Sequence, residues 1–230
     1  MLFKLKTAIT VFTLLCVALP AAAQQIKKDK SPPSNELFSP RTPTPQRLFS
    51  ANLSMPPQFG KTNNLMQKTG SFYAAAGELI YIHGTLTDSF GVPISGAVVE
   101  IWQTNSAGKY HSLLEQNSDL TDKNFNMSGR ITTDNLGNYH FITIMPGFYL
   151  NRAPHINFNI YHPKFGKLET EMYFEDHPKN EEDYQYLSYS ADERKLLTGI
   201  VRLKNIFDSR STKIVNFNLV MAGTHQYKGF

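Results

Sequence analysis

The sequence predicts an all-β protein, an antiparallel β-sandwich with one short helix near its C-terminal end. Short segments between residues 78 and 222 alternate apolar and polar positions and are rich in β-branched and aromatic residues. Turn signals such as SFGVP and NLG separate them at fairly even spacing. Many short strands divided by regular turns are typical of a β-sandwich.

Seven segments have this strand pattern, and one segment has a helical pattern. The helical segment is 190–202, where Ser190 can cap the first turn and Glu193, three residues later, completes a capping box. The charged run KNEEDY, 179–184, is interpreted as a solvated loop. The expected strands are 78–88, 96–104, 129–134, 138–144, 154–162, 168–174 and 213–222.

Residues 1–23 have the features of a secretory signal peptide. Two lysines precede an apolar run, which ends in Ala-Ala-Ala before Gln24. The run is short for a membrane span, so we expect cleavage and an exported protein, periplasmic or extracellular, without a membrane anchor. Cys16 is the single cysteine and lies in this segment. The mature chain must therefore fold without disulfides.

The remaining chain divides into two parts by composition. Residues 24–70 carry seven of the thirteen prolines and are expected to form a Pro-rich arm or linker. Residues 71–230 are expected to form the sandwich domain. Removing the two lysines of residues 1–23 leaves 21 basic and 19 acidic residues, a net charge of +2. This balance, with no dense Lys/Arg patch, argues against a nucleic-acid partner.

Tyrosine and histidine side chains at strand ends are candidates for a metal site. Tyr110 and Tyr149 each follow a glycine-containing turn. His155 and Asn157 lie two apart in an expected strand and therefore share one face. Tyrosinate is a hard oxygen donor, but the phenol pKa of ~10 means that a metal would have to drive its deprotonation. The alternative is ordinary packing, which is the usual role of aromatic residues in a sandwich.

Four longer motifs resemble the intradiol ring-cleavage dioxygenases, and among them the protocatechuate 3,4-dioxygenase subunits. The motifs are GTLTDSFGVPISGAVVEIWQTNSAGKY, TTDNLGNYHFITIMPGFY, RAPHINF and LETEMYF with the following EDHP. They occur in the same order as in the family, from about Pro40 to Ala222. The resemblance implies a β-sandwich and a non-haem Fe(III) held by two tyrosines and two histidines.

The family motifs assign the site residues. Tyr110 ends the W-Q-x-x-x-x-G-x-Y motif, and Tyr149 ends P-G-x-Y. His155 takes the place of the first histidine of a His-x-His pair, and Asn157 stands at the second. An active-site arginine of the family falls on Arg152. The resemblance therefore implies a site that retains three of its four metal ligands.

Two departures from the family pattern leave alternatives open. Asn157 could bind the metal through its amide oxygen, could hold a water there, or could weaken the site. His162 points to the opposite face and is a poor substitute, whereas His111 is a less implausible one. Glu171 stands where relatives have Gln. It could change the local charge, act as a replacement ligand, or face solvent.

The resemblance implies an exported enzyme that inserts O₂ into a catechol and gives a muconate-type diacid. In this scheme Tyr149 is the ligand that substrate displaces, so it accepts a proton. Arg152 stabilises negative charge on the ring. Assembly into a homo-oligomer is also expected. The alternative is a secreted β-sandwich binding module of the same family that has lost the chemistry, which Asn157 and Glu171 would favour.

Overall fold

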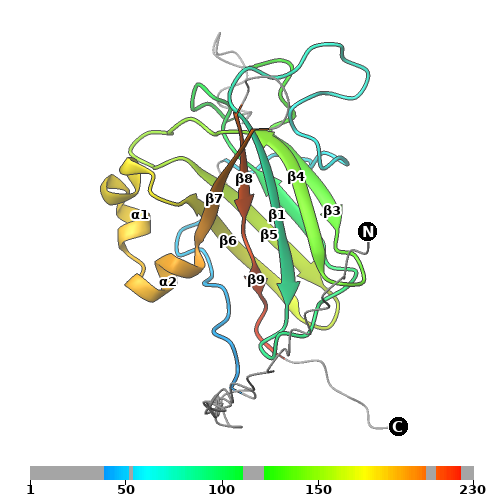
Figure 1. Ribbon diagram of the computed structural model, residues 1–230, viewed down its shortest axis with the longest axis vertical. Helices are drawn as coiled ribbons and strands as arrows, with labels where there is room; N and C mark the ends of the chain where they lie inside the picture. The colour runs from blue at the N-terminus through cyan, green and yellow to red at the C-terminus, as the bar shows by residue number, and fades with distance from the viewer. Residues whose placement is uncertain (1–38, 52–53, 111–121, 206–210, 224–230) are drawn as a thin grey trace, which may run out of the picture. The chain divides into compact units, whose positions relative to one another are not determined.

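The computed structural model describes residues 39–51, 54–110, 122–205 and 211–223, and its nine strands join in one mixed sheet (Figure 1). The order across the sheet is β3-β2-β5-β6-β7-β8-β1-β4, with β9 paired to β1. The predicted signal peptide and His111 lie outside the described residues. The strands are β1 (Leu79–Thr87), β2 (Val98–Trp102), β3 (Ser128–Thr132), β4 (Asn138–Ile144), β5 (His155–His162), β6 (Gly166–Phe174), β7 (Thr198–Asn205), β8 (Ser211–Asn216) and β9 (Leu219–Val220).

The prediction of a mainly β fold is confirmed, but the antiparallel pairing holds only in part. β1 pairs in parallel with both β8 and β9, and β6 pairs in parallel with β7. The remaining pairings are antiparallel. A parallel neighbour needs a long crossover connection, and a helical segment between β6 and β7 provides one.

The core lies between the two halves of this sheet. On β5 the side chains of Ile156, Phe158 and Ile160 are fully buried on one face. The ring of Phe158 packs against Tyr139 of β4 at 6.2 Å and against Phe217, which follows β8, at 5.3 Å. Each such side chain contributes about 1.5–3 kcal/mol on burial. The opposite face of β5, with His155 and Asn157, is thereby turned away from this core.

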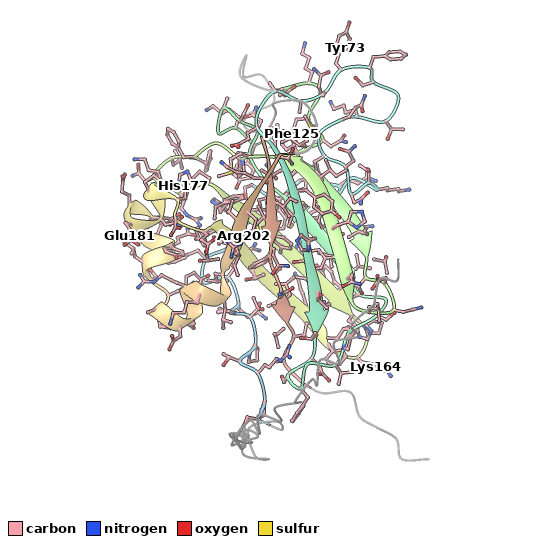
Figure 2. The ribbon with its side chains drawn as sticks, viewed as in Figure 1. Tyr73, Phe125, Lys164, His177, Glu181 and Arg202 are labelled. Carbon is pink, nitrogen blue, oxygen red and sulfur yellow. The ribbon has the colours of Figure 1, made fainter. Side chains whose placement is uncertain are left out.

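The segment between β6 and β7 contains η2 (Pro178–Glu182), α1 (Tyr184–Leu187) and α2 (Ala191–Leu196), which lie beside these two strands (Figure 1). The predicted capping box of Ser190 and Glu193 is confirmed. His177, the N-cap of η2, and Glu181 are labelled there in Figure 2. None of these helices is long and apolar enough to cross a membrane, and the same holds for every helix in the described ranges.

The predicted helix 190–202 is wrong at its C-terminal half. The helix ends at Leu196, and the residues from Thr198 onward form β7. Pairing with β6 and β8 holds these residues in the extended conformation. The close approach of the strands requires glycine at position 199, because a Cβ there would lie 2.7 Å from the Val215 side chain and 2.9 Å from Met172 Sδ.

The N-terminal part of the described chain runs along the strands without joining the sheet. Arg41 N donates to Ser89 O, Thr44 N to Val220 O and Arg47 N to Glu169 O. The hydroxyl of Thr170, on β6, donates to Pro45 O at 2.8 Å. These bonds tie the segment to Ser89 just after β1, to β9 and to β6, and the Arg47 side chain reaches Asn157 on the face of β5 that is turned away from the core.

Candidate active site

Strand register brings Trp102 of β2, Asn157 of β5 and Glu171 of β6 into one row. Asn157 lies directly opposite Trp102 on β2 and opposite Glu171 on β6. His155 lies opposite Tyr173. Because alternate residues of a strand share a face, His155 and Asn157 project to the same side. This row lies at the end of β5 away from the β5–β6 turn that contains Lys164 (Figure 2).

Two glycines allow the tyrosine-bearing loops to meet beside this row. A Cβ on Gly108 would lie 2.1 Å from Phe148 O, and a Cβ on Gly147 would lie 2.4 Å from Gly108 N. Neither distance is compatible with a side chain, so both positions require glycine. The close approach places the rings of Tyr110 and Tyr149 at 5.1 Å in an edge-to-face arrangement.

His155 is fixed in one tautomer. Its Nδ1 lies 2.7 Å from Ala153 O, which can only accept, so Nδ1 carries the proton. Nε2 is then an acceptor and lies 3.2 Å from the hydroxyl of Tyr110. Burial and the charge of Arg152 lower the pKa of His155, which keeps the ring neutral. Its Nε2 lone pair is therefore available to a proton or a metal.

Neighbouring groups fix the amide orientation of Asn157. Arg47 Nη1 can only donate, and it lies 3.3 Å from Asn157 Oδ1. Asn157 Nδ2 donates to Trp102 O at 3.3 Å and to the Tyr110 hydroxyl at 3.2 Å. The side chain thus presents a donor, not an acceptor, to the Tyr110 oxygen. Arg47 also stacks over Trp102, with Cζ 5.1 Å from the ring centroid.

The environment of Tyr110 opposes ionisation in the absence of a cation. The residue is 3% exposed, and burial raises its pKa to about 12. The hydrogen bond from Asn157 acts in the opposite direction, because it stabilises the phenolate. Tyr110 is therefore neutral at pH 7 unless a bound cation stabilises the charged form.

Arg152 is the centre of a buried charge network. Its Nε lies 3.0 and 2.9 Å from the two carboxylate oxygens of Asp183, and its Nη2 lies 2.5 Å from Glu171 Oε2. Nη2 also donates to the Tyr173 hydroxyl at 2.7 Å, and that hydroxyl donates to Glu171. Burial alone would lower the pKa of Arg152, but Glu171 and the other nearby anionic groups outweigh it and raise the pKa.

The predicted residues surround one pocket of about 360 Å³. It lies at the lower end of the ~300–1,000 Å³ range of small-molecule sites. Six residues singled out from the sequence line it: Tyr110, Tyr149, Arg152, His155, Asn157 and Glu171. Its other lining residues are Phe49, Ser50, Ala51, Ser54, Leu150, Asn151, Tyr184 and Gln185. Within the described ranges, no group of three or more His, Cys, Asp or Glu is suited to a metal, so a metal here depends on tyrosine oxygens.

Two of the alternatives are settled by position. The solvent-facing interpretation of Glu171 is wrong, because its exposure is 1% and register places it against Asn157. His162 was predicted to point away from the site, and it does not line the pocket. Its ring packs on Phe165 instead.

The interpretation of KNEEDY as a solvated loop is wrong for its aspartate. Asp183 is fully buried and accepts hydrogen bonds from Gln185 N, Tyr186 N and Ala153 N. An N-cap signal was present, since Asp precedes the short α1 helix. Arg47 was also missed, and its position in a Pro-rich stretch gave no signal of a role at a site 110 residues away.

The comparisons with known proteins identify the family of this chain. The family model described as Dioxygenase matches residues 55–223. The chain therefore belongs to the intradiol ring-cleavage dioxygenases, a family of oxidoreductases.

Two sequence relatives and one solved structure illustrate the similarity. A Rickettsia typhi protein named as a dioxygenase is 35% identical over 179 residues, 74% of this chain and 78% of its own length. The protocatechuate 3,4-dioxygenase β chain of Burkholderia cepacia is 39% identical over 110 residues, 44% of this chain and 47% of its own. The solved intradiol ring-cleavage dioxygenase of Tetranychus urticae superposes with a TM-score of 0.60 at 19% identity, covering 82% of this chain and 98% of that one.

Proposed function

We propose that this protein is an intradiol-type dioxygenase that inserts O₂ into a catechol-type substrate on a non-haem Fe(III). The observation that carries the proposal is the convergence of Tyr110, Tyr149 and His155 on one pocket beside Arg152. Both atoms of O₂ enter the product, a muconate-type diacid. The reaction therefore needs no additional reductant.

The donor set fits a ferric ion. Two phenol oxygens and a neutral imidazole are hard or intermediate donors, which suit Fe(III). The unprotonated Nε2 of His155 already faces the Tyr110 oxygen. Asn157 Oδ1 is bound to Arg47, so a direct bond from this oxygen to a metal would require the Arg47 contact to break. A bound Fe(III) would supply the Lewis-acid and redox chemistry of ring oxygenation.

The protein groups have separate roles in this proposal. Tyr149, half-buried in the pocket wall, accepts the proton of one catechol hydroxyl as its phenolate and becomes a neutral phenol. Arg152 stabilises the negative charge that develops on the ring, and its guanidinium is charged at any working pH. Asn157 holds the Tyr110 oxygen by the bond from Nδ2, which favours the phenolate.

The second candidate, a secreted binding module without catalysis, is not favoured by the comparisons. It would keep the pocket and lose the metal.

We also propose export after cleavage near Ala23, on the basis of the N-terminal pattern, and a homo-oligomeric state, on the basis of the family resemblance. N-terminal sequencing of protein from its native host and light scattering of the purified protein test these two proposals.

A spectroscopic experiment tests the proposed function. The protein is loaded with Fe(III), its visible spectrum is recorded, and O₂ uptake and diacid formation are followed after catechol is added. A tyrosinate-to-iron absorption band is expected, and it should weaken or shift in both Tyr110→Phe and Tyr149→Phe. Tyr161→Phe, on the outer end of β5, is the control and should leave the band unchanged. Absence of both the band and O₂ uptake in the wild type would refute the proposal.

A further inference from the structure

The pocket is polar at its inner end and apolar at its mouth. The inner end carries His155, Asn157 and Glu171, with exposures of 5%, 2% and 1%. Phe49, Leu150 and Tyr184 also line the pocket, but their exposures are 40%, 76% and 56%. We call these last three residues the apolar rim. A ligand that fits both ends has polar groups at one side and an apolar group at the other.

The charged groups at the inner end already have partners, and Arg47, which does not line the pocket, donates to Asn157 Oδ1. Arg152 is the only Lys or Arg among the described residues that line the pocket. It is paired with Glu171, which also lines the pocket, and with Asp183 behind it. An anionic substituent on a ligand would therefore meet a guanidinium that is already paired with two carboxylates. Burial of a carboxylate without its own cation is strongly unfavourable.

The apolar rim is held in an exposed position by the backbone and by ring packing. The rings of Phe49 and Tyr184 contact edge to face at 5.6 Å. Leu150 has φ 52°, a left-handed conformation that is strained for a non-glycine residue. Exposed apolar side chains that border a pocket commonly contact a ligand, and backbone strain concentrates at such sites.

We propose that the preferred ligand is an uncharged catechol whose ring bears an apolar substituent, which packs against Phe49, Leu150 and Tyr184. The proposal rests on the proposed function for the catechol group itself. Catechols with a carboxylate on the ring should bind poorly, because that carboxylate would lie against the apolar rim, while Arg152, the cation that lines the pocket, is already paired with Glu171 and Asp183. Glu171 and Leu150 are then the residues that determine specificity.

Equilibrium binding without O₂ tests the proposal independently of catalysis. Calorimetry compares catechol, 4-phenylcatechol and 3,4-dihydroxybenzoate on the protein with and without added Fe(III). We expect 4-phenylcatechol to bind at least tenfold more tightly than 3,4-dihydroxybenzoate, and more tightly than catechol. Equal or tighter binding of 3,4-dihydroxybenzoate, or no binding of 4-phenylcatechol in either form, would overturn the proposal.

Variants assign the preference to the two ends of the pocket. Leu150→Asn, which suits the left-handed backbone, should reduce the advantage of 4-phenylcatechol over catechol severalfold. Leu136→Asn, at an exposed leucine in the β3–β4 turn that does not line the pocket, should leave it unchanged. Glu171→Gln should improve the relative binding of 3,4-dihydroxybenzoate. If neither Leu150→Asn nor Glu171→Gln alters the preferences, the proposal is wrong. Binding without cleavage in air would instead contradict only the proposed function.

Discussion

Arg47 donates a hydrogen bond to Asn157 across 110 residues of sequence, with Nη1 3.3 Å from Oδ1. This contact turns the amide nitrogen of Asn157 toward Tyr110. Asn157, which the family resemblance sets at the position of the second histidine, therefore donates a hydrogen bond to Tyr110, another candidate ligand. Burial lowers the pKa of Arg47, but nearby acidic groups, Glu171 first, act in the opposite direction.

Asn157→His should strengthen iron binding. The new imidazole would lie on the same face as His155 and would add a better donor than the amide. We expect Fe(III) affinity to rise by about tenfold or more, since changes outside the ligand set alone often alter affinity ~10–100-fold. Competition with a chelator measures the affinity. His155→Ala should abolish binding, and an unchanged affinity in Asn157→His would show that residue 157 does not face the metal.

Asp183→Ala should destabilise the protein strongly and disturb the site. The substitution removes both carboxylate contacts to Arg152. It also removes the acceptor for the backbone N–H of Ala153, and the carbonyl oxygen of Ala153 orients the His155 ring. Breaking a buried ion pair by removing one partner costs about 3–5 kcal/mol. Urea denaturation measures this loss.

The matched control for this change is Asp192→Ala on helix α2. Asp192 is almost fully exposed and pairs with Lys195 at the surface, so its loss should leave the denaturation midpoint nearly unchanged. Equal effects of the two substitutions would contradict the structural role assigned to Asp183.

Gly147→Ala should separate the two tyrosine-bearing loops without unfolding the sheet. The added methyl group would overlap Gly108 N and Ser106 O, at 2.4 and 2.6 Å. We expect a weaker tyrosinate-to-iron band and an unchanged far-ultraviolet circular dichroism spectrum. Gly166→Ala is the control, because a Cβ added there would have no neighbouring atom within 4 Å and its φ of +79° adds only local strain. A normal band in Gly147→Ala would argue against the loop contact as the determinant of the site.

Tyr189 should make the stability of the protein fall at alkaline pH. Burial raises its pKa from the ordinary value of 10.0 to about 12. Because the folded state binds this proton more tightly, the associated stability is complete below pH 10 and is lost as pH rises through about 12. Tyr189→Phe should therefore give a shallower decline between pH 10 and 12. At neutral pH it should be less stable, since Leu48 N loses its acceptor. Denaturation midpoints across this range provide the measurement, and an identical slope in both proteins would contradict the assignment.

Most of the strands could be predicted because their signals are local. Alternation and turn residues identified β1 to β6, and the Ser190–Glu193 capping box gave the start of α2. The extent of α2 could not be predicted, because the residues after it form β7 by pairing with β6 and β8, which the local sequence does not specify. The parallel pairing of β1 with β8 likewise depends on residues far apart in the chain.

The sequence by itself determined the kinds of side chain available to the site and that His155 and Asn157 share a face, since strand alternation requires it. Only the tertiary structure decided what those side chains do. Register placed Glu171 beside Asn157, folding buried Asp183 against Arg152, and the N-terminal segment brought Arg47 to the amide oxygen of Asn157. The physical reason is that hydrogen-bond direction and charge pairing depend on the distance between groups in space, which periodicity along the chain does not specify.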